Sequence, residues 1–179
     1  MTEQTTQKKY ELLKDDTVEH LGRTLYRIKA LITFGLVGAG QLGGYIETEK
    51  NLDHSGNAWV HDNALVYGNA LVYGDACVYG DAWVYGNAQV YGNARVFGNA
   101  WVRSFAVICE RKMIFWASNV GSENGTLTVS NGKFGLIVTR GCFTGTVDEF
   151  LSKSKKVHDE KTHHEYKLLI EVAQSRILN

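Results

Sequence analysis

The segment from Arg140 to Thr146 holds residue types that bind phosphate. It reads Arg-Gly-Cys-Phe-Thr-Gly-Thr, and Thr146 precedes Glu149 by three residues, which is the spacing of a capping box. A helix is therefore expected to begin at Val147, and its first turn offers unpaired N–H groups and a partial positive charge. Arginine binds a phosphate through two parallel hydrogen bonds, and aromatic rings stack on bases. We predict a ligand site made by Arg140, Phe143, Thr144, Thr146 and Arg103.

Simple capping of the helix is the alternative interpretation of this segment. Cys142 lies within it, and a nearby helix start lowers a thiol pKa, but no orienting base can be assigned from the sequence. A structural cysteine is therefore expected rather than a nucleophile. His158, His163 and His164 stand close to Glu160 and Glu165, yet no metal-binding spacing occurs. A solvated helix surface is expected there, with no metal, no cofactor and no catalytic residue.

The centre of the chain is a repeat of six residues. From Asn57 to Ser104 it reads NAWVHD, NALVYG, NALVYG, DACVYG, DAWVYG, NAQVYG, NARVFG and NAWVRS. The valine suits a short buried strand, the alanine allows close approach of backbones, and Asn or Asp with Gly supplies a corner. A unit this short cannot bury its own apolar face, so the units must coil on one another.

This pattern resembles the hexapeptide-repeat proteins, which fold as left-handed parallel β-helices. Val60 with Ala64, and Val66 with Ala70, follow their rule of an aliphatic residue and a small one four positions later. The resemblance covers roughly residues 22–104, and the Asn-Ala-x-Val-Tyr-Gly variant looks like small phage and prophage proteins. It implies three hexads in each coil, about three coils, and a homo-oligomer, with a trimer favoured.

Stacking of successive coils then places residues eighteen apart in outward columns. Leu65, Trp83 and Trp101 form an apolar column, which is predicted to meet another subunit or the C-terminal segment because exposed apolar patches mark interfaces. Tyr67, Tyr85 and Arg103 form a second column, in which ring stacking stabilises the coils.

Many hexapeptide-repeat proteins are acyltransferases that use a histidine base near a subunit interface. By that resemblance His61 is the best-placed base in this chain. However, the hexads run without an insertion for an acceptor site, and three coils give a face only about 14 Å tall. His61 is therefore interpreted as a polar member of an aromatic column, and coenzyme A thioesters are predicted not to bind.

The two ends of the chain are predicted to be separate modules of a mainly β protein. Residues 1–44 form an N-terminal cap, in which a hairpin of strands 8–13 and 23–32 turns at 15–17 and covers the first coil. The G-x-G-x-x-G at 38–43 lacks a following helix, so it is a turn rather than a dinucleotide site. After the β-helix of residues 45–116, residues 117–179 form a hairpin at Asn131-Gly132 and two helices, beginning at Val147 and at about Glu160.

The composition limits the partners. The chain has 179 residues, and its 19 basic and 19 acidic side chains cancel, so neither a nucleic-acid polymer nor an anionic membrane is indicated. No apolar run reaches the ~18 residues of a membrane helix, and the first residues lack the apolar stretch of a signal peptide. The 3 cysteines are odd in number and fit reduced thiols. We expect a cytoplasmic protein, located in the host cytoplasm if phage-encoded.

Three functions remain open at this point. The preferred one is a non-enzymatic phage or prophage binding protein, whose rigid β-helix is a scaffold that sequesters a host target, either a host protein or a phosphorylated nucleotide signal of host defence. The second is an acyltransferase that uses coenzyme A. The third is a purely structural oligomerisation protein.

Overall fold

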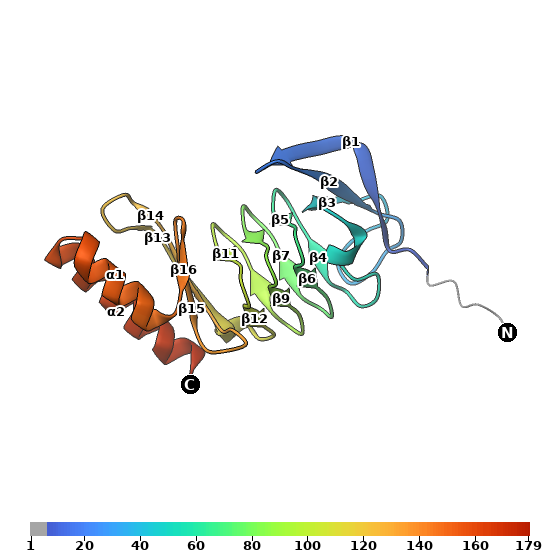
Figure 1. Cartoon of the computed structure of the whole chain (residues 1–179). Coiled ribbons are helices and arrows are strands. Elements are labelled where there is room, and N and C mark those ends of the chain that lie inside the picture. The colour runs from blue at the N-terminus through green and yellow to red at the C-terminus, as the bar shows by residue number, and fades with distance from the viewer. Residues whose placement is uncertain (1–6) are drawn as a thin grey trace.

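The chain forms a β-hairpin, a central β-solenoid and a C-terminal sheet covered by two helices, in that order (Figure 1). The structure is a computed structural model that describes residues 7–179. The first six residues, on which the signal-peptide prediction partly rests, lie outside the described part. The predicted mainly β fold class is confirmed.

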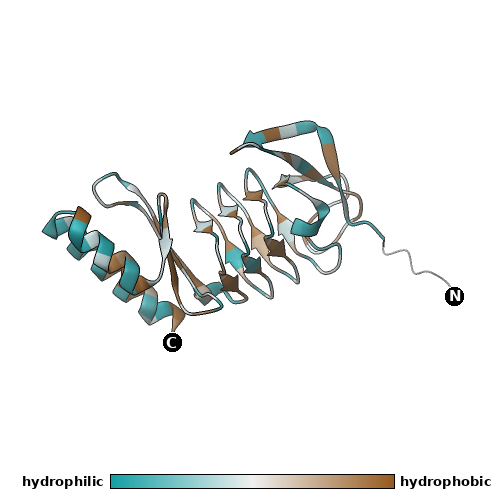
Figure 2. Cartoon of the chain, in the orientation of Figure 1, coloured by the Kyte–Doolittle hydropathy of each residue, from teal (hydrophilic) through white to brown (hydrophobic). Residues whose placement is uncertain are grey.

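One two-residue strand per hexad builds the solenoid. These strands pair in parallel on three faces, β4–β7–β10, β5–β8–β11 and β6–β9–β12, with partners eighteen residues apart, as in Trp83 with Trp101. The valines and alanines of the hexads point inward and are buried. The outward position of each strand varies, so the strands are hydrophobic and hydrophilic in turn (Figure 2). The strands are β4 (Trp59–Val60), β5 (Leu65–Val66), β6 (Leu71–Val72), β7 (Cys77–Val78), β8 (Trp83–Val84), β9 (Gln89–Val90), β10 (Arg95–Val96), β11 (Trp101–Val102) and β12 (Val107–Ile108).

The solenoid has about 4 turns, where the hexads alone predicted about three. The additional coil comes from residues before the recognisable repeat. β3 (Leu42–Ile46) pairs in parallel with β5, and Leu52 bridges to Val72. Leu52 and the end of β3 lie inside the β-helix predicted over residues 45–116, but they depart from the hexad pattern, so counting the regular hexads missed this coil.

The N-terminal hairpin extends one face of the solenoid. β1 (Tyr10–His20) pairs with β2 (Arg23–Ala30), and β2 pairs with β3, all antiparallel. The hairpin is as predicted, but the turn predicted at 15–17 is wrong. That segment lies inside β1 at a register shift, and the chain turns at Leu21 and Gly22, which both have positive φ. The G-x-G-x-x-G segment is a turn into β3, in which the Gln41 N–H donates to the Gly38 carbonyl.

Side chains close the open edge of the first coils. Lys9 Nζ donates to the carbonyls of Ala58 and Gly56, at 2.8 and 3.4 Å. Asn51, in the 3-10 helix η1 (Glu49–Asn51), donates from Nδ2 to the carbonyls of Ala70 and Gly68, at 3.0 and 3.1 Å. Carbonyls that have no coil above them are thereby satisfied, which buried backbone groups require.

The C-terminal module is a four-stranded antiparallel sheet with two helices on one face. It contains β13 (Ile114–Val120), β14 (Gly125–Ser130), β15 (Ile137–Arg140), β16 (Phe143–Gly145), α1 (Val147–Val157) and α2 (Glu160–Ile177). Both predicted helices and the predicted β14–β15 pairing are present. The turn predicted at Asn131-Gly132 is instead a longer loop, because Asn131 binds the end of the solenoid through the backbone of Met113 and Val107. Within residues 7–179, neither helix is long and apolar enough to cross a membrane.

Candidate ligand-binding groove

The predicted phosphate-binding segment is divided between two ends of a hairpin. β15 ends at Arg140 and β16 begins at Phe143, and the pairing places Thr146 beyond the opposite end from Arg140. Thr146 caps α1, as its Oγ1 accepts from the Glu149 N–H at 3.2 Å. Arg140 Nε donates to the Tyr166 hydroxyl at 3.0 Å instead. The helix start and Arg140 therefore do not form one anion site.

The other predicted ligand residues are separated further. Arg140 and Phe143 line a small pocket of about 230 Å³ together with Lys153. Thr144 Oγ1 is buried and has no hydrogen-bond partner among residues 7–179. Arg103 stacks over the Tyr85 ring at 5.8 Å, and its Nε and Nη2 are likewise buried without a partner in that range. A ligand role for these residues stays a prediction.

The predicted apolar column is formed as expected but is covered differently. The rings of Trp83 and Trp101 stack with centroids 4.6 Å apart. Leu65 is buried by the N-terminal hairpin, through Leu25, and His20 contacts the Trp83 ring edge-on at 4.4 Å. The hairpin thus covers the Leu65 end, and the predicted C-terminal segment reaches the other end, where the Trp101 N–H donates to Thr128 Oγ1 of β14 at 3.2 Å. Contact of the half-buried tryptophans with another subunit stays a prediction.

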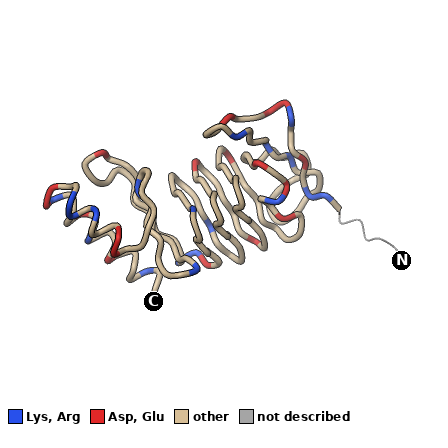
Figure 3. Tube along the Cα trace, in the orientation of Figure 1, with Lys and Arg blue, Asp and Glu red and all other residues tan. Residues whose placement is uncertain are grey.

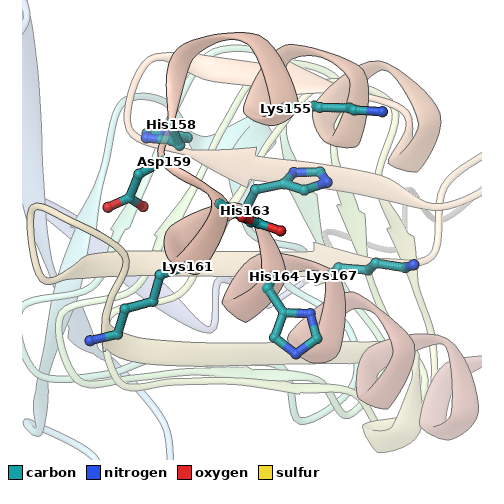
Figure 4. A pocket seen from close by; sticks show the side chains of 8 residues that line it. Lys155, His158, Asp159, Lys161, His163, His164 and Lys167 are labelled. Atoms are coloured by element: carbon teal, nitrogen blue, oxygen red, sulfur yellow. The ribbon is translucent and has the colours of Figure 1, made fainter.

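The histidine-rich start of α2 is an open surface. Figure 4 shows the side chains of His163 and His164 pointing in different directions, and His163 Nδ1 lies 3.1 Å from Ser154 Oγ. Lysines 155, 161 and 167 line the same hollow. Within residues 7–179 no group of three side chains is placed to hold a metal ion. Cys142, the predicted structural cysteine, is exposed rather than buried because it lies in the turn between β15 and β16.

The solenoid face of β4, β7 and β10 carries a groove that the sequence analysis did not identify. Its C-terminal half, of about 640 Å³, is lined by aromatic side chains and by three arginines. The lining residues are Tyr79, Arg95, Phe97, Arg111, Ile114, Phe115, Trp116 and Arg176.

Three separate elements supply the arginines. Arg95 is on β10, Arg111 begins the 3-10 helix η2 (Arg111–Met113), and Arg176 lies in the last turn of α2. Helix α2 packs against η2 and β13, so the basic positions of η2 lie near the C-terminal end of α2 (Figure 3). Among residues 7–179, no carboxylate lies within 4.0 Å of any of these three guanidinium groups. The C-terminal half of the groove therefore carries three arginines that no ion pair neutralises.

The aromatic side chains give this half of the groove a rigid wall. The rings of Tyr79 and Phe97 stack at 4.8 Å with an interplanar angle of 7°. Trp116, on β13, meets the Phe97 ring edge-on at 4.5 Å and thereby joins the solenoid to the C-terminal sheet. Aromatic faces beside arginines are suited to planar, anionic ligands.

The N-terminal half of the groove continues from the first through Tyr79 and Arg95. It has about 440 Å³ and is bounded by the loop Gly35–Val37 and by Asp62 and Asp75. Cys77 lies on its floor. Burial raises the pKa of the Cys77 thiol, opposed by the charge of Arg95.

His61, the histidine favoured by the resemblance to acyltransferases, also lines the N-terminal half. It is half-buried, and its ring centroid lies 6.3 Å from that of Tyr79, as the column predicted. Burial lowers the pKa of His61, opposed by the charge of Asp62. The neutral imidazole is thereby favoured.

One sequence signal for the groove was present. The hexad NARVFG places Arg95 in the slot before valine and replaces the usual tyrosine by Phe97, so two adjacent outward positions change together. Arg111 and Arg176 carry no such signal, because only the packing of α2 against η2 brings them to the same face.

Comparison with known families agrees with the architecture. The family model for the YdcK beta solenoid repeat matches residues 64–80 and 88–104, which lie within the coils. No curated protein matches the chain. This match agrees with the parallel coils, in which paired residues lie eighteen positions apart. The chain is a β-solenoid repeat protein whose coils are similar to the YdcK beta solenoid repeat, and such a scaffold fits a structural or binding role.

Proposed function

We propose that the protein binds and sequesters a small ligand of the nucleotide class in this groove, without transforming it. The observation that carries the proposal is the set of three uncompensated arginines, from three elements, in one aromatic-lined groove. Guanidinium groups bind phosphate oxygens through short, charge-assisted hydrogen bonds. The adjacent rings offer a stacking surface for a base.

The resemblance of the hexads to phage and prophage proteins suggests where such a ligand comes from. A phage protein that holds a nucleotide without consuming it removes that nucleotide from the host. A phosphorylated signal of host defence is therefore the ligand to test first. This role needs high affinity and abundance of the protein, and needs no catalytic residue.

Acyl transfer is the second candidate, because the groove also contains His61. Coenzyme A carries phosphates and an adenine ring, which suit the arginine end, and a neutral His61 is the form that acts as a general base. Consumption of the thioester distinguishes the two candidate functions. Acetyl-coenzyme A incubated with the protein and a panel of amine and hydroxyl acceptors is expected to stay intact, whereas thioester loss that disappears in His61→Ala favours the enzyme.

Calorimetry on the purified protein tests the binding function. The panel contains nucleoside diphosphates, cyclic nucleotides and acetyl-coenzyme A. Arg111→Ala and Arg176→Ala are the test variants, since both side chains are exposed and their removal leaves the core intact. Each is expected to weaken nucleotide binding by about tenfold or more, because a hydrogen bond to a charged group contributes about 1.5–3 kcal/mol.

Two controls assign the site. Lys14→Ala removes an exposed cation of β1 that lines none of the pockets described above, and it is expected to change nothing. Arg140→Ala tests the residue favoured by the sequence. Weakened binding in Arg140→Ala with unchanged binding in Arg111→Ala would move the site to the Arg140 pocket. Failure of every nucleotide to bind would contradict the proposal and leave the structural oligomer.

A further inference from the structure

The rings that line the C-terminal half of the groove differ in which of their surfaces a ligand can reach. One face of Tyr79 stacks on Phe97 at 4.8 Å, and its other face meets the His61 ring at 6.3 Å with an interplanar angle of 86°. Phe97 is covered in the same way, by Tyr79 on one side and by Trp116 at 4.5 Å on the other. Both faces of these two rings are occupied, so they have only their edges left for the groove.

These ring edges attract anionic groups. The edge of an aromatic ring carries partial positive charge, whereas its face carries partial negative charge. The edges of Tyr79 and Phe97 stand beside the guanidinium groups of Arg95, Arg111 and Arg176, which no ion pair neutralises in the described part of the chain. This half of the groove is therefore a surface for an extended anion.

Trp116 is oriented differently from the two stacked rings. Its plane stands at 86° to that of Phe97. A Cβ atom at Gly98 would lie 3.0 Å from Trp116 Nε1, so the indole edge that carries Nε1 points at this corner of the coil. Phe115, the neighbouring ring of the lining, packs into the core beneath the helices instead. The face of Trp116 is therefore the stacking surface that this half of the groove offers to a base.

The number of arginines determines how much negative charge the ligand needs. Three guanidinium groups carry three positive charges, because arginine stays protonated in proteins. A single phosphate monoester carries about 1.5 to 2 negative charges at pH 7, and a second phosphoryl group adds about one more, with further oxygens for bidentate pairs. The volume of about 640 Å³ also lies in the range of sites for whole organic ligands, roughly 300–1,000 Å³.

We propose that the groove selects nucleotides by their number of phosphates, binding those with two or more phosphoryl groups and tolerating different bases. This inference rests on the proposed function and specifies its ligand. The phosphates lie against the arginines and the ring edges, and the base stacks on Trp116. Every base has a π face, so stacking accepts all of them. Among the described residues that line this half, none has a carboxylate or amide side chain that could distinguish one base edge from another.

Calorimetry with AMP, ADP, UDP, cyclic AMP and inorganic pyrophosphate tests this selection. ADP is expected to bind at least about tenfold more tightly than AMP or cyclic AMP, which is the gain from one additional charge-assisted hydrogen bond. ADP and UDP are expected to agree within about threefold, because stacking supplies the contact to the base.

Variants assign the selection to the groove. Arg95→Gln, Arg111→Gln and Arg176→Gln are each expected to reduce the preference for ADP over AMP severalfold. Lys112→Gln is the matched control, since it removes an exposed cation next to Arg111 that lines none of the pockets described above. Trp116→Leu is expected to weaken ADP binding and to leave pyrophosphate binding unchanged, which also shows that this variant stays folded.

The outcomes separate the two proposals. Equal affinity for AMP and ADP, or an ADP preference that survives all three arginine variants, overturns the inference about phosphate number. An equal effect of Lys112→Gln does the same. Discrimination between ADP and UDP as strong as that between AMP and ADP, or full ADP binding in Trp116→Leu, overturns base-tolerant stacking. In each case the proposed nucleotide-binding function stands if Arg111→Ala weakens binding, whereas failure of every phosphate compound to bind overturns both proposals.

Discussion

His20 joins the tip of the N-terminal hairpin to the solenoid. Its ring contacts Trp83 edge-on, and its Nε2 lies 3.2 Å from the Tyr67 hydroxyl. Burial lowers the pKa of His20. The contact therefore favours the neutral imidazole, which makes the docking of the hairpin sensitive to pH.

The sign of this pH dependence follows from linkage. The folded-state pKa of His20 lies below its unfolded value of about 6.5, so the unfolded chain binds more protons in this range. We expect stability to be full above about pH 6.5 and to fall as the pH drops from there through the folded-state pKa. His61 contributes in the same direction.

Urea unfolding at pH 7.5 and pH 5 measures this effect. Between pH 7.5 and pH 5 the unfolding free energy of His20→Gln is expected to fall by less than that of the wild type, since glutamine does not titrate. The His61→Gln variant shows the share of the second histidine. Identical pH dependence in the wild type and both variants would refute the assignment.

The hexad pattern predicted which side chains fill the interior of the solenoid, but it did not predict the role of the side chains on its surface. Valine and alanine slots fixed what points inward, and the corner glycines adopt positive φ, as Gly86 does at 67°. Asp62 and Ser104 take the same left-handed conformation without being glycine, at 54° and 61°. Outward side chains such as Arg95 follow no such constraint, so their role depends on what packs nearby.

At the scale of elements, the side-chain caps take the place of a strand on the two faces of the solenoid that the N-terminal hairpin does not extend. Asn51 is fully buried, and its Oδ1 also accepts from the Thr48 N–H at 2.9 Å. Its Nδ2 therefore supplies the donors that the carbonyls of Gly68 and Ala70 would otherwise receive from a preceding strand. Open sheet edges otherwise recruit other chains.

Replacement of this cap is expected to destabilise the protein markedly. Asn51→Ala leaves the buried carbonyls of Gly68 and Ala70 unsatisfied, which costs about 1–3 kcal/mol of unfolding free energy. Asn69→Ala is the matched control, because Asn69 is an exposed corner residue whose Nδ2 donates only to Asn87. That change is expected to stay within about 0.5 kcal/mol. Equal effects of the two substitutions in chemical unfolding would contradict the capping role.

Element boundaries were predictable only where local chemistry fixes them. The capping box at Thr146 and Glu149 placed the start of α1 correctly. The polar run at 15–17 looked like a turn, yet pairing with β2 continues past it through a register shift. β13 and β16 have no strand pattern of their own and are strands because they pair with β14 and β15, so the sequence did not predict them.

At the scale of the whole molecule, the tryptophan stack offers a surface for assembly. Trp83 and Trp101 remain half-buried after the hairpin has covered Leu65. We predict a homo-oligomer, with a trimer favoured by the family resemblance, and with this stack at the interface.

Analytical ultracentrifugation checks the prediction. Trp101→Asp is the better variant, since Trp83 also contacts His20 within its own chain. A lower sedimentation coefficient in Trp101→Asp is expected, with the unfolding midpoint showing that the monomer stays folded. A wild-type protein that sediments as a monomer at micromolar concentration would exclude the interface.

The arginine groove illustrates why a site can be invisible in a sequence. Arg95, Arg111 and Arg176 span nearly half of the chain, and only the docking of α2 beside η2 gathers them. The sequence did predict α2, whose buried face contains Tyr166, Ile170 and Ala173. It did not predict where that face docks, because the partner strand β13 was itself unrecognised.

Because the two end walls of the groove are attached at opposite ends of the solenoid, the number of coils between them sets the length of the groove. The Gly35–Val37 loop stands at the first coil, and η2 and α2 stand beyond the last. Duplication of one eighteen-residue coil would move these walls apart by about 4.8 Å without altering either of them. Under the proposed function, the length of the bound ligand can therefore change with the number of coils, while the residues at the two ends of the groove stay the same.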